Sequence, residues 1–531
     1  MPTDCISYQD SGYFIPLMND YLDQKEHLKP LYNRFPSLEN FKDQITEKHT
    51  NYPDSNREIL HSVLTKHYAQ IAISDFTARN IEAIKESNTF TVTTGHQLNL
   101  FTGPLYFLYK IISTINLTKE LKQAYPDKNF VPIYWMATED HDFEEINYFN
   151  FKGKKFRWNK ESSGPVGRMS TDGLEAVFDV FASELGLGKN AEELKNMFGS
   201  AYLKHNNLAD ATRYLANVLF GSYGLVILDA DDVALKTLFI PYIKEELLHQ
   251  MSHKKVSETS ELLSDYKIQV NPREINLFYI EDDLRERIIL EDSTYFVNTK
   301  EIKFTEEELL KELEIHPEKF SPNVIMRPLY QEVILPNLCY IGGGGEIAYW
   351  LELKSYFEAS KITFPVLLLR NSVVLATEKQ ANKADKLSLT WRDLFLNQLA
   401  LKDKVVKKES AFNLDFSEQK MFLEVQFAKL REIAKLTDAS FTGAVNAQEK
   451  KQVKGLNNLE KRLIKAEKKR HVEKLNRIIE LQNELFPYEG LQERTLNFSE
   501  FYLVSGNRLI EGLMQELKPL ALDFTINIVH N

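Results

Sequence analysis

Cysteine is almost absent from this sequence, which contains only Cys5 and Cys339 among 531 residues. Two cysteines so far apart form no CxxC pair, and they supply neither a disulfide framework nor a cysteine-rich zinc site. We therefore expect reduced thiols and no bound metal.

Long apolar runs are missing as well. No stretch reaches the roughly 20 apolar residues that a membrane helix needs. The first residues, MPTDCISYQDSGYF, lack the basic and apolar regions of a secretion signal. These absences predict a cytoplasmic protein that makes no contact with a membrane.

Positive charge is not in excess. The chain contains 65 Lys and Arg and 76 Asp and Glu, which gives a net charge of −11. A negative chain is a poor match for the phosphate backbone of nucleic acid. The basic run at 461–477 is interrupted by Glu467 and Glu473, so a solvated helix face is the better interpretation. Nucleic acid is therefore not an expected partner.

The sequence does contain the pattern of an α/β domain. Residues Phe90–Thr94 are aromatic and β-branched and predict a strand that stops at Gly95. Pro104 suits the first turn of the apolar helix that follows. Phe130–Met136 predict a second strand, so residues 90–136 have the order of a βαβ unit in a parallel sheet.

Similar patterns extend this domain in both directions. Residues 10–90 have mostly helical spacing, and residues 295–297 predict a small hairpin or edge element. Further short apolar runs, separated by helical patterns, lie at 225–228, 276–280 and 364–369. We therefore predict a parallel-sheet α/β core with a helical N-terminal segment over residues 1–375.

The remaining residues, 376–531, are predicted to form a helical coiled-coil domain. Strand signals fade after Ser372, and apolar residues keep helical spacing through Ser417–Thr437 and 456–485. The segment Asp438–Gln448 is expected to supply the turn between two antiparallel arms. Because the apolar stripes need a partner surface, we predict that these arms join two chains.

Polar residues follow the first predicted strand at the point where a parallel sheet binds ligands. Glycines there let a ligand approach the backbone, and the next helix offers free N–H groups to an anion. An ordinary turn with one hydrogen-bonded histidine is an equally good interpretation. The candidate residues of this glycine loop are Gly95, His96, Gln97, Asn99, Thr102 and Gly103.

An acidic loop follows the second predicted strand and places five carboxylates around His141 within seven positions. Such crowding is costly unless a cation, an amine or a hydroxyl-rich ligand compensates it, which favours a functional role over a structural one. A neutral His141 could act as a general base whose ring a flanking acid orients. The candidate residues of this loop are Glu139, Asp140, His141, Asp142 and Asn147.

A third group of candidates lies in the later half of the α/β region. Four consecutive glycines before Glu346 could wrap a ligand, although a flexible turn is the simpler alternative. Arg327 and Arg370 could bind a carboxylate or a phosphate, or could be structural partners of the acidic loop. The candidates of this group are Ser321, Asn323, Arg327, Gln331, Gly343, Glu346, Tyr349 and Arg370.

Four of these segments, in this order, resemble the BshC family of cysteine ligases in bacillithiol biosynthesis. They are TTGHQLNLFTGPLYFLYKI at 93–111, WMATEDHDFEEIN at 135–147, SPNVIMRPLYQE at 321–332 and GGGGEIAYWLELK at 342–354. The resemblance implies a Rossmann-like core related to class I aminoacyl-tRNA synthetases. It also implies connecting-peptide insertions in that core and a C-terminal coiled coil that forms a homodimer.

The resemblance further implies a reaction, the addition of cysteine to glucosaminyl-malate. By analogy with amino-acid-activating enzymes, ATP would activate the cysteine carboxylate and the glucosamine amine would attack it. His96, Asp140 and His141 would then be catalytic, and the other candidate residues would bind the substrates and ATP or ADP. Two alternatives stay open: a metal-dependent hydrolase built on Glu139–Asp142, and a non-catalytic scaffold of the same pathway.

Overall fold

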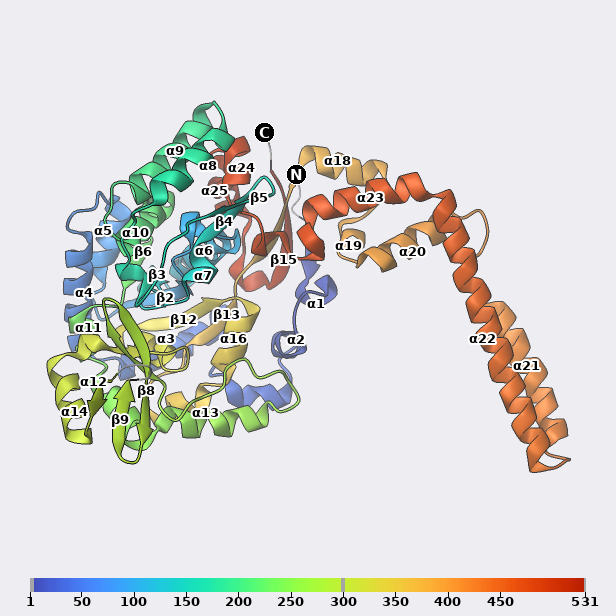
Figure 1. Ribbon diagram of the computed structural model, residues 1–531, viewed down its shortest axis with the longest axis horizontal. Helices are drawn as coiled ribbons and strands as arrows, with labels where there is room; N and C mark the ends of the chain where they lie inside the picture. The colour runs from blue at the N-terminus through green and yellow to red at the C-terminus, as the bar shows by residue number, and fades with distance from the viewer. Residues whose placement is uncertain (1–3, 298–300, 530–531) are drawn as a thin grey trace. The chain divides into compact units, whose positions relative to one another are not determined.

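The computed structural model describes residues 4–297 and 301–529 (Figure 1). The chain divides into two compact units, of which the first is Met1–Leu375 together with Leu491–Asn531 and the second is Ala376–Gly490. Within the described ranges, no helix is long and apolar enough to cross a membrane.

The first unit is built on a parallel five-stranded sheet with the strand order β13-β12-β2-β3-β6. Its strands are almost fully buried, and apart from the threonine-rich β2 they are rich in Val, Ile, Leu and Tyr, as expected where both faces of a sheet are covered. The strands are β2 Thr89–His96, β3 Asn129–Met136, β6 Val226–Asp229, β12 Asn337–Gly342 and β13 Val366–Leu369. The predicted α/β class is thus confirmed.

The predicted βαβ unit is present at the centre of this sheet. Strands β2 and β3 pair in parallel along their whole length, from Thr89 opposite Asn129 to His96 opposite Met136. The connecting helix α6, Tyr106–Ala124, packs along both strands. Strand β12, which pairs with β2 on its other side, was not among the strands that the sequence predicted.

The order of the strands fixes where a ligand can enter. The chain runs outward from β2 through β3 to β6 and then returns to the other side of β2 as β12 and β13. The loops that leave β2 and β12 therefore turn away from each other at the carboxyl edge of the sheet. In open parallel sheets such a reversal leaves a crevice that binds ligands.

The two faces of β2 carry different side chains. Phe90 and Val92 belong to an apolar cluster that also contains Phe41 and Ile45 of helix α3, Leu38–Asn51. Because side chains alternate along a strand, Thr91 and Thr93 point to the opposite face. There both threonine hydroxyls donate hydrogen bonds to Asn337 at the start of β12.

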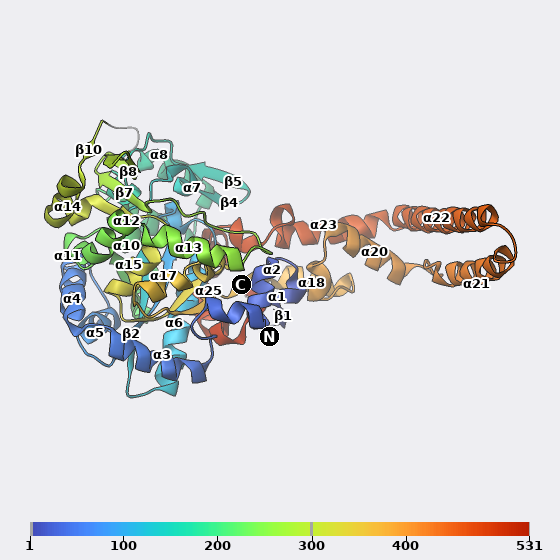
Figure 2. The same ribbon diagram turned by 90° about the horizontal axis from the view of Figure 1, so that it is seen from below.

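Helices of the first unit surround the sheet (Figures 1 and 2). Those before β2 are α1 Tyr8–Ser11, α2 Pro16–Leu22, α3, α4 Asp54–Tyr68 and α5 Asp75–Ala83. Those between β3 and β12 are α7 Phe143–Ile146, α8 Leu174–Leu185, α9 Lys189–Tyr202, α10 Leu208–Phe220, α11 Val233–Thr237, α12 Ile240–His249, α13 Met251–Leu262, α14 Glu306–Ile315 and α15 Arg327–Ile334. Helices α16, Gly344–Leu351, and α17, Lys354–Ala359, join β12 to β13.

Two smaller sheets are inserted between β3 and β12. The hairpin of β4, Tyr148–Phe151, and β5, Lys154–Arg157, follows the acidic loop. An antiparallel sheet has the order β10-β9-β8-β7-β11, and the element predicted at 295–297 is one of its strands. Its strands are β7 Leu277–Glu281, β8 Leu284–Glu291, β9 Thr294–Val297, β10 Lys303–Phe304 and β11 Phe320–Pro322.

The end of the chain differs from the prediction of one helical domain over 376–531, because residues 491–531 belong to the first unit. Strand β15, Asp523–Val529, pairs antiparallel with β1, Asp4–Ser7, in a three-stranded sheet with β14, Ser372–Thr377. Asn497, just before helices α24 Ser499–Ser505 and α25 Arg508–Glu516, donates hydrogen bonds to the carbonyls of Phe101 and Gly103. Pairing between distant segments leaves no trace in local periodicity, which explains the difference.

The second unit is helical, and its long hairpin is formed by α21, Ser417–Ala434, and α22, Ala439–Arg470 (Figure 2). The turn between these helices is shorter than predicted, because the Asp438 side chain caps α22 by accepting from the N–H groups of Ser440 and Phe441. The other helices are α18 Glu378–Lys386, α19 Trp391–Leu394, α20 Gln398–Glu409 and α23 Val472–Leu485.

Candidate active site

A cavity of about 830 Å³ lies at the point where the strand order reverses. The glycine loop lines it from β2, and the four-glycine segment lines it from β12 and α16. We call it the glycine-loop cavity. Its lining residues include Gly95, His96, Gln97, Tyr106, Lys110, Arg327, Gly343, Glu346, Tyr349, Arg370 and Arg494.

Lys110 and Glu346 form an ion pair in the wall of this cavity. Lys110 Nζ lies 2.5 Å from Glu346 Oε2 and donates to the carbonyl of Gly95 at 2.7 Å. Burial lowers the pKa of Lys110, although Glu346 opposes this effect. Burial raises the pKa of Glu346, but Lys110 and the N–H of Gly343 outweigh it and hold that pKa below its ordinary value. Lys110 thus links Gly95 at the end of β2 to Glu346 in α16, the helix that follows β12.

Two buried polar groups in the wall lack partners. His96 Nε2 and Arg370 Nε have no hydrogen-bond partner among the described residues, and both side chains are at most 7% exposed. Burial, with Lys110 and Arg370 nearby, holds the pKa of His96 well below its ordinary value, so its ring is neutral. Unpaired buried groups cost free energy, which an anionic or polar ligand in the cavity would recover.

A second cavity, of about 480 Å³, adjoins the first and contains the acidic loop. We call it the acidic-loop cavity. Trp135, Ala137, Val324 and Arg327 line both cavities, so the two meet at these side chains. The other residues that line it include Glu139, Asp140, His141, Arg273, Phe278, Arg285, Arg287 and Asn323.

His141 contacts an arginine rather than a flanking acid. Arg285 Nη1 lies 2.7 Å from His141 Nδ1, while the nearer Asp140 oxygen is 3.7 Å from the same nitrogen. Burial and Arg285 lower the pKa of His141, so the neutral ring predominates at pH 7. A guanidinium can only donate, so Nδ1 accepts and the ring proton sits on Nε2. In this geometry His141 is a hydrogen-bond donor to a ligand oxygen.

The carboxylates of the acidic loop have different partners. Glu139 Oε1 lies 2.6 Å from Lys236 Nζ, and Asp140 Oδ2 accepts from Gln97 Nε2 at 3.0 Å. Glu144 pairs with Arg157. These contacts relieve the crowding that the sequence indicated. In the part of the chain that the structure describes, no three His, Cys, Asp or Glu side chains are grouped so that they could hold a metal ion.

The structure brings most predicted site residues to one edge of the sheet. The contact between Gln97 and Asp140 joins the glycine loop to the acidic loop directly. Asn99 and Gly103 line a third cavity of about 340 Å³ beside the first. Five candidates lie outside the linings of these three cavities: Thr102, Asn147, Ser321 and Gln331, which are buried, and Asp142, which is exposed.

Sequence reasoning missed several cations of the two cavities. Lys110 lies within the apolar helix α6, so its pattern indicated burial rather than a site. Arg285 belongs to a strand of the inserted sheet, and Arg494 follows the second unit in the chain. Only the folded chain places them at the carboxyl edge. A lysine within the largely apolar first part of α6 is a local signal that could have been used.

Comparisons with known proteins give matches over nearly the whole chain. Residues 1–371 match the family described as "Bacillithiol biosynthesis BshC, N-terminal Rossmann-like domain", and residues 373–529 match the corresponding "C-terminal coiled-coil domain". Relatives named "Putative cysteine ligase BshC" include those of Flavobacterium johnsoniae, 66% identical, and Flavobacterium psychrophilum, 64% identical. Each alignment covers 99% of this chain and 99% of the relative.

A solved structure from Campylobacter jejuni, named a "putative arginyl t-RNA synthetase", aligns over 84% of this chain and 95% of its own at 11% identity. Its TM-score of 0.20 is too low to relate the two folds.

Proposed function

Because the chain belongs to the BshC family of bacillithiol biosynthesis, we propose that it is a ligase that joins cysteine to glucosaminyl-malate. Relatives along its whole length carry the name of a cysteine ligase. The single observation of geometry that supports a ligase is the pair of adjoining cavities, since a condensation must hold two substrates side by side.

The reaction that we propose has two steps. The cysteine carboxylate attacks the α-phosphorus of ATP, which forms a mixed anhydride and releases pyrophosphate. The glucosamine nitrogen then attacks the activated carbonyl carbon, the new C–N bond forms, AMP leaves and the nitrogen loses a proton. The cysteine thiol takes no part in either step.

The charges of the two cavities suit substrates of this kind. Cysteine, the malate group and ATP all carry anionic oxygens, and the cavities are lined by Lys110, Arg273, Arg285, Arg287, Arg327, Arg370 and Arg494. The neutral rings of His96 and His141 add polar groups without adding charge. His141 Nε2–H is suited to donate to a carbonyl oxygen as negative charge develops on it.

One assay tests this function. Purified protein is incubated with cysteine, glucosaminyl-malate and ATP, and the thiol product is measured by mass spectrometry. A product of the expected mass that requires all three compounds supports the ligase. Product formation without ATP would contradict carboxylate activation, and no turnover by the folded protein would favour the scaffold.

We also propose that the second unit joins two copies of this chain. Several large apolar side chains face outward from the hairpin, including Phe422 at 58%, Val425 at 53% and Ile433 at 54% exposure. The inner seam of the hairpin is small, with Phe427, Ala434 and Val445 as its buried cluster. An apolar stripe of this extent on a helical hairpin is typical of an oligomer contact.

A further inference from the structure

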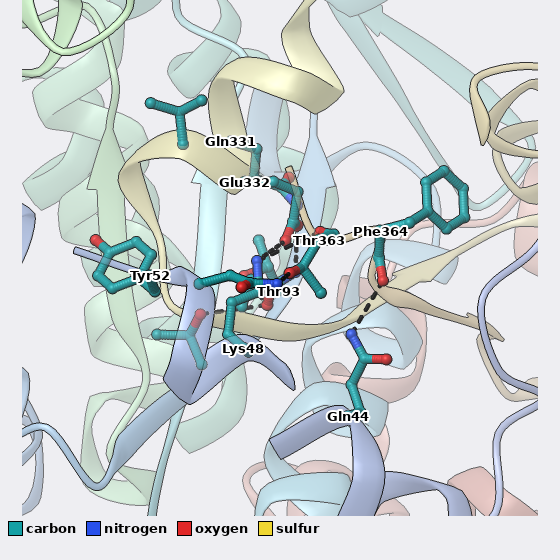
Figure 3. A network of polar contacts seen from close by, with 12 residues as sticks. Gln44, Lys48, Tyr52, Thr93, Gln331, Glu332, Thr363 and Phe364 are labelled. Carbon is teal, nitrogen blue, oxygen red and sulfur yellow. Dashed lines mark hydrogen bonds and ion pairs between the residues drawn. The ribbon is translucent and has the colours of Figure 1, made fainter. Parts of the chain in front are cut away.

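A buried polar network joins helix α3 to helix α15 (Figure 3), and its central residues Lys48 and Glu332 are not part of either cavity lining. At its centre Lys48 Nζ of α3 lies 2.9 Å from Glu332 Oε2, and the two side chains are 2% and 0% exposed. The other oxygen, Glu332 Oε1, accepts from Asn337 Nδ2 at 2.6 Å and from Gln331 Nε2 at 3.0 Å. The Glu332 carboxylate therefore accepts hydrogen bonds from three side chains.

The network continues from Gln331 to Arg327. These residues are one turn apart on α15, so their side chains share one face of the helix. Arg327 Nη1 donates to Gln331 Oε1 at 3.2 Å. An amide presents its oxygen on one side and its two donors on the other. Because the carboxylate of Glu332 takes the donor side, the oxygen of Gln331 must face Arg327.

Arg327 lies where the two cavities meet, and it lines both. Its guanidinium carbon lies 5.6 Å from the ring centre of Trp135 and 5.7 Å from that of Tyr340. Its Nη2 donates to the hydroxyl of Tyr349 at 3.3 Å. The aromatic rings and the Tyr349 hydroxyl restrict the side chain, and Gln331 Oε1 is a second acceptor, which reaches the guanidinium from within α15.

Stability alone gives a poor explanation of this arrangement. Burying a lysine and a glutamate costs much of what their attraction returns, and apolar pairs of similar size are often as stable. A fixed orientation of neighbouring groups is a better reason to keep such a pair. Here the Lys48–Glu332 pair orients the side-chain amide of Gln331, and that amide faces Arg327 of the candidate site.

We propose that Glu332 is a positioning residue, which holds the Gln331 amide in one orientation and thereby holds Arg327 at the junction of the two cavities. This role rests on the proposed function, because Arg327 then binds an anionic substrate group between the two reactants. Glu332 itself touches no substrate. Glu332 acts through Gln331. It accepts from the Gln331 amide nitrogen, which excludes the flipped amide orientation and keeps the Gln331 oxygen facing Arg327.

The first test is the substitution Glu332→Gln, which keeps the size of the side chain but offers donors as well as an acceptor. Gln331 can then turn its amide over and present N–H groups to Arg327, which displaces the guanidinium. We expect the KM of at least one anionic substrate to rise on the order of tenfold, with a smaller change in kcat. Cysteine, glucosaminyl-malate and ATP are each varied in turn.

A matched control is Tyr52→Phe. The Tyr52 hydroxyl donates to the carbonyl of Ile334 at 2.8 Å, so it also holds α15 in place, but no dashed line in Figure 3 joins it to Gln331 or Glu332. Both variants lose a buried polar contact and should lower the melting temperature. Only Glu332→Gln should change KM. If the two variants share the same kinetics, Glu332 is structural and the proposal is wrong.

Exchange of the two residues gives a second, sharper test. In the double variant Gln331→Glu with Glu332→Gln, the carboxylate at 331 has only acceptors, so it faces Arg327 with an oxygen in either orientation. We expect KM to return to within about threefold of the wild-type value. A double variant with the KM of Glu332→Gln alone would contradict the amide mechanism.

Two further measurements keep the proposal testable. If Glu332→Gln does not fold, Gln331→Met removes the amide acceptor of Arg327, keeps the Lys48 ion pair and should give the same rise in KM. If the wild-type protein forms no product, the proposed function fails, and crystal structures of the wild type and Gln331→Met still test the positioning role. An Arg327 guanidinium that occupies the same place in both structures overturns it.

Discussion

His96 and His141 stand at the ends of neighbouring strands but have different surroundings. His96 is buried against Tyr106 and Phe107, and its Nε2 faces no partner among the residues described. His141 is partly exposed and accepts from Arg285. Both rings are neutral, so each can contact a reacting group without adding charge to the site.

Replacement of either histidine by asparagine separates a catalytic role from a structural one. Asparagine keeps some hydrogen bonding but has no imidazole, so we expect each variant to lose product formation by on the order of a hundredfold. His205→Asn is the matched control, since His205 contacts the carbonyls of Ser200 and Ala201 away from the cavities. Unchanged turnover in the folded His96 and His141 variants would show that the chemistry lies elsewhere.

Glu352 should make the stability of the first unit depend on pH. Its side chain is 1% exposed, and burial raises its pKa to about 7 from an ordinary value near 4.5. The folded chain therefore holds a proton that the unfolded chain releases earlier. Stability from this group is fully present below about pH 4.5 and falls as the pH rises through about 7.

The substitution Glu352→Gln should remove this dependence. We expect the variant to melt at a higher temperature than the wild type at pH 8, and to show little or no advantage at pH 4.5, because only the ionised carboxylate is penalised. Thermal unfolding followed by circular dichroism at both pH values measures the difference. Glu26→Gln serves as a control, since that side chain is 87% exposed. An equal effect at both pH values would contradict this account.

At the scale of elements, the acidic loop is supported by the short helical turn Val166–Arg168, η3. The N–H of Gly167 donates to the carbonyl of Thr138 at 2.8 Å, and the N–H of Val166 donates to that of Asp140 at 2.7 Å. A Cβ at position 167 would lie 2.6 Å from Thr138 Cβ and 2.9 Å from its carbonyl oxygen. Glycine is therefore required for this close approach.

Gly167→Ala should move the acidic loop away from β3. We expect a loss of about 1–3 kcal/mol in the free energy of unfolding, the usual cost of overpacking, together with reduced turnover. Urea denaturation measures the first effect and the product assay the second. Gly512→Ala in α25 is the control, because a Cβ there meets nothing within 4 Å. Wild-type stability of Gly167→Ala would show that the turn and the loop can separate.

At the scale of the whole molecule, the proposed dimer depends on the outer face of the hairpin. The paired substitutions Phe422→Glu and Ile433→Glu place charges on that face, so we expect a monomer. Light scattering after size-exclusion chromatography measures the mass. Leu187→Glu is the control, because Leu187 is 95% exposed in the first unit. A doubly substituted protein that still has the mass of two chains would remove the basis for this contact.

The sequence by itself determined those features whose signals are local. The βαβ unit at 90–136 could be predicted because strand and helix periodicity are properties of a few neighbouring residues. The glycine and acidic loops could be found for the same reason, since each directly follows its strand. The helices of the second unit likewise depend on spacing within one segment.

The tertiary structure decided everything that depends on distant segments. The place of β12 beside β2 and the return of β15 to β1 are set by hydrogen bonds between residues far apart in the chain. Burial next to a particular partner decides the remaining chemistry. Arg285 determines which ring nitrogen of His141 carries the proton, and Lys48 of α3 pairs with Glu332 of α15; each of these contacts joins distant segments of the chain.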